Sequence, residues 1–275
     1  MVVHRLRGYD LKIEWKKYVY CYSDIGEGST PIIFIHGFPF DKSCWIPQLE
    51  FLKHSNRVIA YDIRGYGESV ADSSQPDLDL FAEDLIHFMD GLKIEKAIVC
   101  GLSMGGYILL NAVSKYPERF AAIVLCDTQC IADSEEAAKN RQLAIDQVAE
   151  GKLPDFAEKF ISKVFCEKTF RDNPDLVAKI KNIVLSTSAE TIIGGLTALK
   201  ERDETCSSLP GISIPSLIVC GKDDVLTPLK QSIDMHSSIK NSTLCVIEDA
   251  GHLSNLENPV QFNDYFHNFI LNLRQ

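Results

Sequence analysis

The sequence contains one serine in a setting that could make it a nucleophile. Ser103 lies in the stretch Gly101-Leu102-Ser103-Met104-Gly105-Gly106, directly after the apolar run KAIVC and directly before the helical pattern YILLNAVSKY. A tight strand-to-helix turn holds such a serine in a strained backbone conformation, and small residues on both sides let the chain segments approach closely. The free N–H groups of the following helix favour the negative charge that develops in acyl transfer. The spacing predicts a nucleophile; the alternative is a glycine-rich turn that only ends a buried strand.

A serine hydroxyl is a weak nucleophile near neutral pH, so it needs a base and a group that orients the base. The stretch GKDDVLTP follows a later apolar run and contains Asp223 and Asp224, and His252 follows the next apolar run. Of the seven histidines, only His252 stands on a loop directly after such a run. Serine, acid and histidine in this order form one of the known catalytic triads. We therefore predict His252 as the general base, although a lone loop histidine is more often a solvated surface residue.

These candidates depend on elements that bring them to one edge of a sheet. An N-terminal antiparallel hairpin is expected from residues 2–7 and 11–22, with a Gly-Tyr-Asp turn between them. Continuous apolar runs then predict strands that are buried on both faces, at 31–37, 57–62, 96–101, 120–127, 215–221 and 243–249. Helical patterns lie among them at 78–92, 104–116, 229–238 and 257–273. This alternation predicts an α/β fold with a mostly parallel sheet covered on both faces, whose ligand sites lie at the carboxyl ends of the strands.

One long stretch, from 129 to 208, breaks the alternation. It includes the charged, helix-like segments EEAAKNRQLAIDQVAEG and FAEKFISKVF and contains no run that resembles a buried strand. A connecting loop of this length is uncommon. We therefore expect a core formed by residues 1–128 and 209–275, with residues 129–208 inserted as a helical cap that packs as a lid over the sheet.

Composition narrows the classes of partner. The net charge of −10 disfavours binding to phosphate backbones and anionic lipid, so we expect neither a nucleic-acid nor a membrane partner. The nine cysteines are odd in number and scattered, and we interpret them as reduced thiols. The N-terminus lacks the pattern of a signal peptide. Together these features predict a cytoplasmic protein. Neither a His-x-x-x-His spacing nor a G-x-G-x-x-G fingerprint is present, so we expect no metal and no organic cofactor.

Five motifs in order make the chain resemble the α/β-hydrolase superfamily, and within it the 3-oxoadipate enol-lactonase-like serine carboxylesterases. The motifs are HGFP from His36, DIRGYGES from Asp62, Gly101 to Gly106, GKDD from Gly221 with Pro228, and AGHLSNLENP from Ala250 to Pro259. The resemblance implies the α/β-hydrolase fold, with a mostly parallel eight-stranded sheet, helices on both faces and a helical lid insertion. The family pattern Gly-x-x-Asp-x-x-x-Pro places the orienting acid at Asp224 and leaves Asp223 as the fallback.

The resemblance also implies the remaining parts of the site. The backbone N–H groups of Phe38 and Met104 would form the oxyanion hole, while His36, Asp62 and Arg64 would brace the surrounding loops. The implied activity is hydrolysis of small-molecule carboxylic esters or lactones through an acyl-enzyme on Ser103, by a monomer or homodimer. Several alternatives stay open. One is a lactone hydrolase of the 3-oxoadipate enol-lactonase type, and another is a small-molecule receptor on the same fold that does not turn its ligand over. Perhydrolysis, amide cleavage and C–C bond hydrolysis use the same triad and also stay open.

Overall fold

The sheet of this protein has eight strands. The structure is a computed structural model that describes residues 8–15, 18–70 and 75–273, and all structural statements concern these residues. The strand order is β1-β2-β4-β3-β5-β6-β7-β8. The pairs β1/β2 and β2/β4 are antiparallel and the other five pairs are parallel, which confirms the predicted architecture. The strands are β1 (Gly8–Trp15), β2 (Tyr18–Ile25), β3 (Ile32–Ile35), β4 (Val58–Tyr61), β5 (Ala97–Leu102), β6 (Phe120–Cys126), β7 (Ser216–Gly221) and β8 (Ser242–Ile247).

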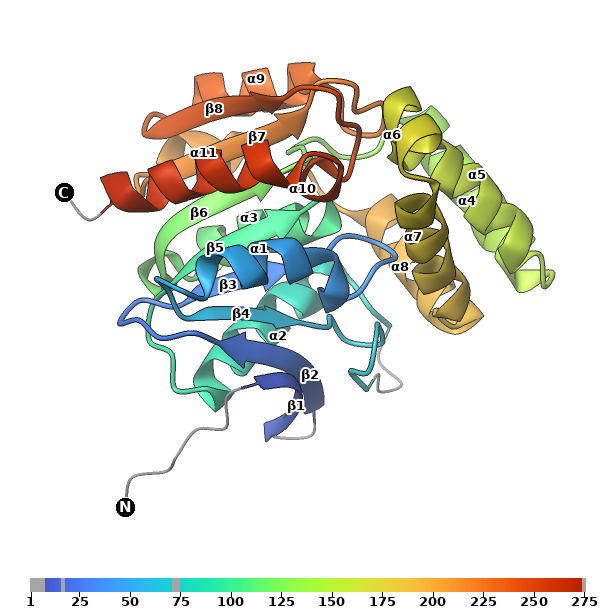
Figure 1. The fold of residues 1–275 in the computed structure, drawn as a ribbon. Helices are drawn as coiled ribbons and strands as arrows, with labels where there is room; N and C mark the ends of the chain where they lie inside the picture. Colours follow the sequence, from blue (N-terminus) through green and yellow to red (C-terminus); the bar gives the residue numbers. More distant parts are fainter. Residues whose placement is uncertain (1–7, 16–17, 71–74, 274–275) are drawn as a thin grey trace.

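Helices cover both faces of the sheet, which explains why its central strands read as unbroken apolar runs (Figure 1). On one face α1 (Ile46–Leu52) packs against α11 (Pro259–Asn272), and the short helix α10 (Ser254–Glu257) precedes α11. On the other face lie α2 (Leu78–Gly91), α3 (Met104–Lys115) and α9 (Leu229–Ser238). The described residues also form three short 3₁₀ helices: η1 (Lys42–Trp45), η2 (Pro117–Arg119) and η3 (Cys206–Gly211).

The N-terminal hairpin differs from its prediction in where the first strand lies. The expected turn residues, Gly8 to Asp10, belong to β1, which continues until Trp15 pairs with Tyr18. The register shifts between Gly8 and Leu11, and Asp10 has φ +53°. Such a bulge absorbs turn-forming residues inside a strand, so composition alone misplaces the turn. The first predicted segment, 2–7, lies outside the described residues.

Five helices lie between β6 and β7, beyond the carboxyl ends of the strands (Figure 1). They are α4 (Glu135–Ala149), α5 (Leu153–Val164), α6 (Glu167–Asp172), α7 (Pro174–Ser186) and α8 (Ala189–Glu201). Side chains of Ser134, Asn173 and Ser188 cap the first turns of α4, α7 and α8. We refer to residues 129–208 as the cap. None of the helices in the described ranges has the length and apolar character needed to cross a bilayer.

A disulfide joins the two ends of the cap. Cys130 follows β6, Cys206 begins η3, and 76 positions separate them along the chain. A backbone hydrogen bond of 2.8 Å from Thr205 N to Cys130 O runs beside the disulfide. The prediction that all nine cysteines are reduced is wrong for this pair, because the fold brings together two residues whose spacing gave no sign of pairing. Cysteine usage therefore no longer supports the prediction of a cytoplasmic protein.

Candidate active site

Ser103 occupies the turn between β5 and α3 in a backbone conformation that non-glycine residues rarely adopt, with φ +52° and ψ −114°. The neighbouring glycines make this turn possible. A Cβ on Gly101 would lie 2.3 Å from the carbonyl oxygen of Gly105, and a Cβ on Gly105 would lie 2.5 Å from that of Ile35. Both positions thus exclude a side chain, and the sharp turn presents the Ser103 hydroxyl at the carboxyl edge of the sheet.

The structure brings the three predicted triad residues together. Nε2 of His252 lies 2.8 Å from Oγ of Ser103, and Nδ1 of His252 lies 2.8 Å from Oδ2 of Asp224. The Asp224 carboxylate also accepts hydrogen bonds from the N–H groups of Leu226 and Thr227 and from the Thr227 hydroxyl, at 2.6 to 3.0 Å. These bonds fix the carboxylate, so that it can hold the histidine in one orientation. Asp223, the fallback acid, is exposed.

Burial and nearby charge shift the pKa values of His252 and Asp224 in opposite directions. Burial favours the neutral imidazole of His252, but the charge and hydrogen bond of Asp224 outweigh burial and raise the His252 pKa above its ordinary value. Burial likewise disfavours the Asp224 carboxylate, but His252 and the Thr227 hydrogen bonds outweigh it and lower the Asp224 pKa. The arrangement therefore stabilises an imidazolium next to a carboxylate, which is the state that proton transfer from Ser103 would create.

The residues expected to form the oxyanion hole flank Ser103 on two sides. Met104 is the first residue of α3. Phe38 follows Gly37, and a Cβ on Gly37 would lie 3.1 Å from Cβ of Ser103. Within the described part of the chain, neither the Phe38 nor the Met104 amide N–H donates to a protein acceptor. Both amides thus remain candidates for the oxyanion hole.

His36 links two loops beside the site. Its Nδ1 lies 2.9 Å from the carbonyl oxygen of Gly37, and its Nε2 accepts the Ile63 N–H at 2.9 Å. Complete burial lowers the pKa of His36, which favours the neutral ring. Because both ring nitrogens are engaged with backbone groups, the geometry suits a bracing residue.

The charged residues after β4 are also engaged within the protein. Asp62 accepts hydrogen bonds from the Lys42 and Glu68 backbone N–H groups and pairs with the Lys42 ammonium at 3.0 Å. Arg64 binds both carboxylate oxygens of Asp84, at 2.6 and 2.7 Å. Both side chains therefore tie their loops to neighbouring elements.

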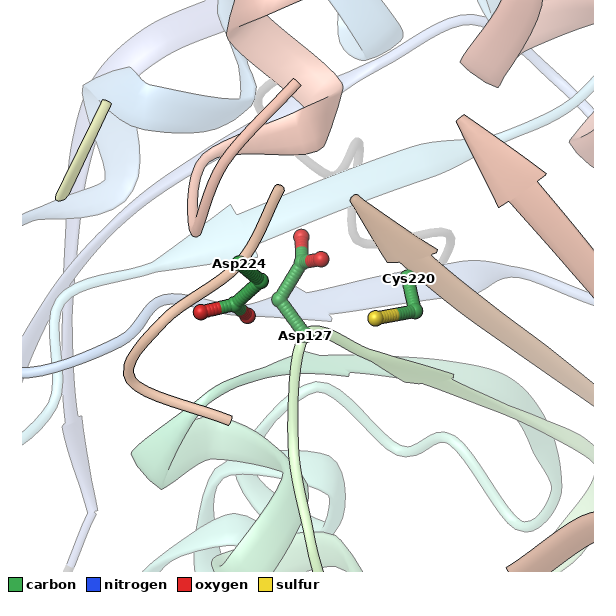
Figure 2. A group of neighbouring side chains, drawn as sticks. All are labelled: Asp127, Cys220 and Asp224. Atoms are coloured by element: carbon green, nitrogen blue, oxygen red, sulfur yellow. The ribbon is translucent and has the colours of Figure 1, made fainter. Parts of the chain in front are cut away.

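A second buried carboxylate, Asp127, lies behind the triad and was not among the residues predicted from the sequence. Asp127 follows β6 directly, and its oxygens accept hydrogen bonds from the Gly221 N–H at 2.7 Å and from the Ser254 hydroxyl at 2.6 Å. Its side chain clusters with Asp224 and Cys220, with one ligand-type atom of each within 4.8 Å of the others (Figure 2). Protein donors already occupy both carboxylates, so we treat the cluster as part of the hydrogen-bond network of the site. An acidic residue at the carboxyl end of a buried strand was the signal that could have revealed it.

Two of the cavities that border the cap also border residues named above. The larger, of about 980 Å³, borders Arg64, Tyr66 and Gly195, and neither cavity is lined by Ser103, Asp224 or His252. The smaller, of about 490 Å³, is lined by Phe38 and Leu226 from the core and by side chains of α4, α5 and α8. Because Phe38 follows Gly37, which lies beside Ser103, and the Leu226 N–H donates to Asp224, the smaller cavity is the better candidate for a substrate pocket.

Comparison with known proteins agrees with the fold. A sequence profile described as the alpha/beta hydrolase fold matches residues 30–259, and the chain belongs to this family. It is 31% identical over 244 residues to 3-oxoadipate enol-lactonase 2 of Acinetobacter baylyi, covering 88% of this chain and 89% of the relative. The resemblance to this group that the five motifs indicated is thus confirmed.

Two solved structures are similar to this chain over nearly their whole length. A thermophilic esterase from Thermogutta terrifontis, with malate bound, matches with a TM-score of 0.91 and 32% identity, covering 96% of this chain and 99% of the esterase. The enol-lactonase from Burkholderia xenovorans matches with a TM-score of 0.88 and 25% identity, covering 95% of this chain and 100% of the enol-lactonase.

Proposed function

We propose that this protein is a serine hydrolase that cleaves small-molecule carboxylic esters or lactones through an acyl-enzyme on Ser103. The observation that carries the proposal is a pair of hydrogen-bond distances. Ser103 Oγ lies 2.8 Å from His252 Nε2, and His252 Nδ1 lies 2.8 Å from Asp224 Oδ2. A base within hydrogen-bond reach of a hydroxyl, itself held by a carboxylate, is the arrangement that makes serine nucleophilic. The names of the esterase and enol-lactonase relatives support the choice of substrate.

In the proposed mechanism, Ser103 Oγ attacks the substrate carbonyl carbon while His252 Nε2 takes the hydroxyl proton. The amides of Phe38 and Met104 hold the resulting oxyanion, and Asp224 stabilises the imidazolium without taking its proton. His252 then protonates the leaving alcohol oxygen as the C–O bond breaks, which leaves an ester on Ser103. Water, deprotonated by His252, attacks this ester; His252 then returns the proton to Ser103 Oγ as the bond between Ser103 and the acyl carbon breaks and the acid is released.

We further propose that the cap shapes the substrate pocket over this site. Phe156, Phe160 and Leu196 of the cap line the 490 Å³ cavity together with Phe38. These apolar walls suit the hydrocarbon part of a small ester. The second candidate is hydrolysis of an enol-lactone, which the 31% identity to an enol-lactonase favours. In a lactone the alcohol stays attached to the acyl group, so the same residues would open a ring.

The test is release of p-nitrophenol from acetate, butyrate and octanoate esters at pH 7 to 8, by the wild type and by Ser103→Ala. We expect wild-type turnover and a loss of at least about 10³-fold in the variant, as for other triads. An enol-lactone assayed in parallel separates the two candidates. If the wild type neither hydrolyses any of these compounds nor reacts with a fluorophosphonate probe, the hydrolase proposal fails and a non-catalytic receptor is the better description.

A further inference from the structure

The cap binds the backbone that carries His252. The carbonyl oxygen of Val164, the last residue of α5, accepts the His252 backbone N–H at 2.7 Å. The contact is close enough that a Cβ on Gly251 would lie 2.8 Å from the same oxygen and 2.9 Å from the Cys166 nitrogen. The loop that positions the proposed base therefore packs directly against the segment between α5 and α6.

Glu257 joins the same two segments through its side chain. One carboxylate oxygen accepts the Gly251 N–H at 2.7 Å. The other accepts the Cys166 N–H at 2.9 Å and the Thr169 hydroxyl at 2.7 Å. Cys166 and Thr169 belong to the start of α6, so a single side chain connects the cap to the residue that precedes His252.

The contacts of the Glu257 carboxylate indicate a structural role. Cys166 and Thr169 are only 5% and 6% exposed. Within the described ranges, no lysine or arginine forms an ion pair with Glu257, so three N–H and O–H donors satisfy its carboxylate instead. Hydrogen bonds to a charged acceptor are stronger than those between neutral groups. Glu257 also lies in the AGHLSNLENP motif, and the proposed mechanism assigns it no role.

We propose that Glu257 is a positioning residue that couples the location of the cap to the orientation of His252. The inference rests on the proposed role of His252 as general base. With α5 and α6 in place, the N–H groups of Gly251 and His252 are both held, one by Glu257 and one by Val164. Movement of residues 164–169 away from the core breaks the Val164 bond and both Glu257 bonds to α6. The His252 backbone is then held less firmly, and catalysis depends on a closed cap.

The test compares three variants under conditions where each is folded. Glu257→Gln keeps one acceptor oxygen but replaces the other with an NH₂ group, which cannot accept a hydrogen bond, so the side chain can no longer accept from both Gly251 and the start of α6. Thr169→Val removes only the cap-side hydroxyl. Thr191→Val is the matched control, because the Thr191 hydroxyl also binds the cap to the core, at 3.0 Å from the Gly65 carbonyl oxygen, but contacts a different loop.

We expect Glu257→Gln to lower kcat for p-nitrophenyl butyrate by about 10- to 100-fold, the scale of a small misplacement of a catalytic group, with KM within about twofold. The second-order rate of fluorophosphonate labelling should fall by a similar factor, because labelling requires the base but not the ester pocket. Thr169→Val should show a smaller loss in the same direction, and Thr191→Val should match the wild type. Rates are expressed per labelled active site, so that loss of folded protein does not imitate loss of kcat.

Three results would overturn the inference, and they are distinguishable. If the wild type turns over and labels but Glu257→Gln keeps kcat and labelling rate within about twofold, Glu257 is not a positioning residue and the proposed function stands. A kcat loss in Thr191→Val equal to that in Glu257→Gln also excludes a specific role for Glu257, because any cap contact would then suffice. If the wild type neither turns over nor labels, the proposed function fails and the inference fails with it.

Discussion

Oδ2 of Asp224 lies 2.8 Å from Nδ1 of His252, although the two residues are 28 positions apart in the chain. Asp223, the adjacent acid, is exposed to solvent instead. The Thr227 hydroxyl donates to the same Asp224 oxygen at 2.6 Å and lies 3.3 Å from His252 Nδ1. The Asp224 carboxylate is therefore held beside the histidine, whereas the Asp223 carboxylate is exposed to solvent.

This difference predicts unequal effects of two isosteric substitutions. Asp224→Asn should lower kcat by about 10⁴-fold, because an amide no longer holds the productive histidine tautomer or stabilises the imidazolium. Asp223→Asn should stay within about twofold of the wild type, since a solvated charge is screened. Steady-state kinetics on p-nitrophenyl butyrate measure both. A larger loss of kcat in Asp223→Asn than in Asp224→Asn would show that Asp223 orients the histidine.

The pH dependence of kcat/KM should follow the raised pKa of His252. His252 acts as a base only when neutral, so activity falls as pH drops through its pKa. Burial lowers this pKa, but Asp224 outweighs burial, and the midpoint of the acid limb is expected above the ordinary value of about 6.5. Initial rates at subsaturating ester between pH 5 and 9 give the midpoint. A midpoint clearly below 6.5 contradicts the assignment of His252 as a base paired with a charged Asp224.

Asp127 should make the protein less stable as pH rises. Burial, followed by the nearby charge of Asp224, raises its pKa to about 8, whereas an unfolded chain has an aspartate pKa of about 3.9. The folded state thus binds this proton more tightly than the unfolded state. The resulting stabilisation is present below pH of about 4 and is lost as pH rises towards 8.

Asp127→Asn carries no such proton and isolates this effect. The melting temperature of the wild type minus that of the variant should decrease steadily from pH 5 to pH 9. Asp223→Asn serves as the control, because it removes the charge of an exposed aspartate by the same isosteric change. A difference between the wild type and Asp127→Asn that stays constant over this range means that Asp127 ionises as an ordinary carboxylate.

The Cys130–Cys206 disulfide should contribute to stability by restricting the unfolded chain over the 76 positions that it spans. We expect Cys130→Ala to lower the free energy of unfolding by about 2 to 4 kcal/mol, as measured by urea titration. Thiol counting supplies the chemical check. Denatured protein without reductant should show seven reactive thiols, and reduced protein should show nine. Nine thiols before reduction would exclude the disulfide.

The buried strands and the order of the triad residues could be predicted because both are local properties of the chain. Unbroken apolar runs such as 96–101 need cover on both faces, and a glycine-flanked serine after such a run fits few structures other than a sharp turn. The N-terminal hairpin shows the limit of this reasoning. A bulge in β1 absorbed the turn-forming Gly8 to Asp10, and the strand continued through them.

Contacts between distant residues were decided by the tertiary structure. Adjacent aspartates such as Asp223 and Asp224 differ only in the direction of their side chains, which the loop after β7 sets by hydrogen bonds. The pairing of Cys130 with Cys206 and the link from Glu257 to α6 depend on how the cap folds back onto the core. The sequence by itself determined the elements and the residue types at the carboxyl edge of the sheet. Packing determined which of those residues come into contact. Contacts between segments far apart in the chain depend on how the whole core is packed, and local sequence patterns do not specify this.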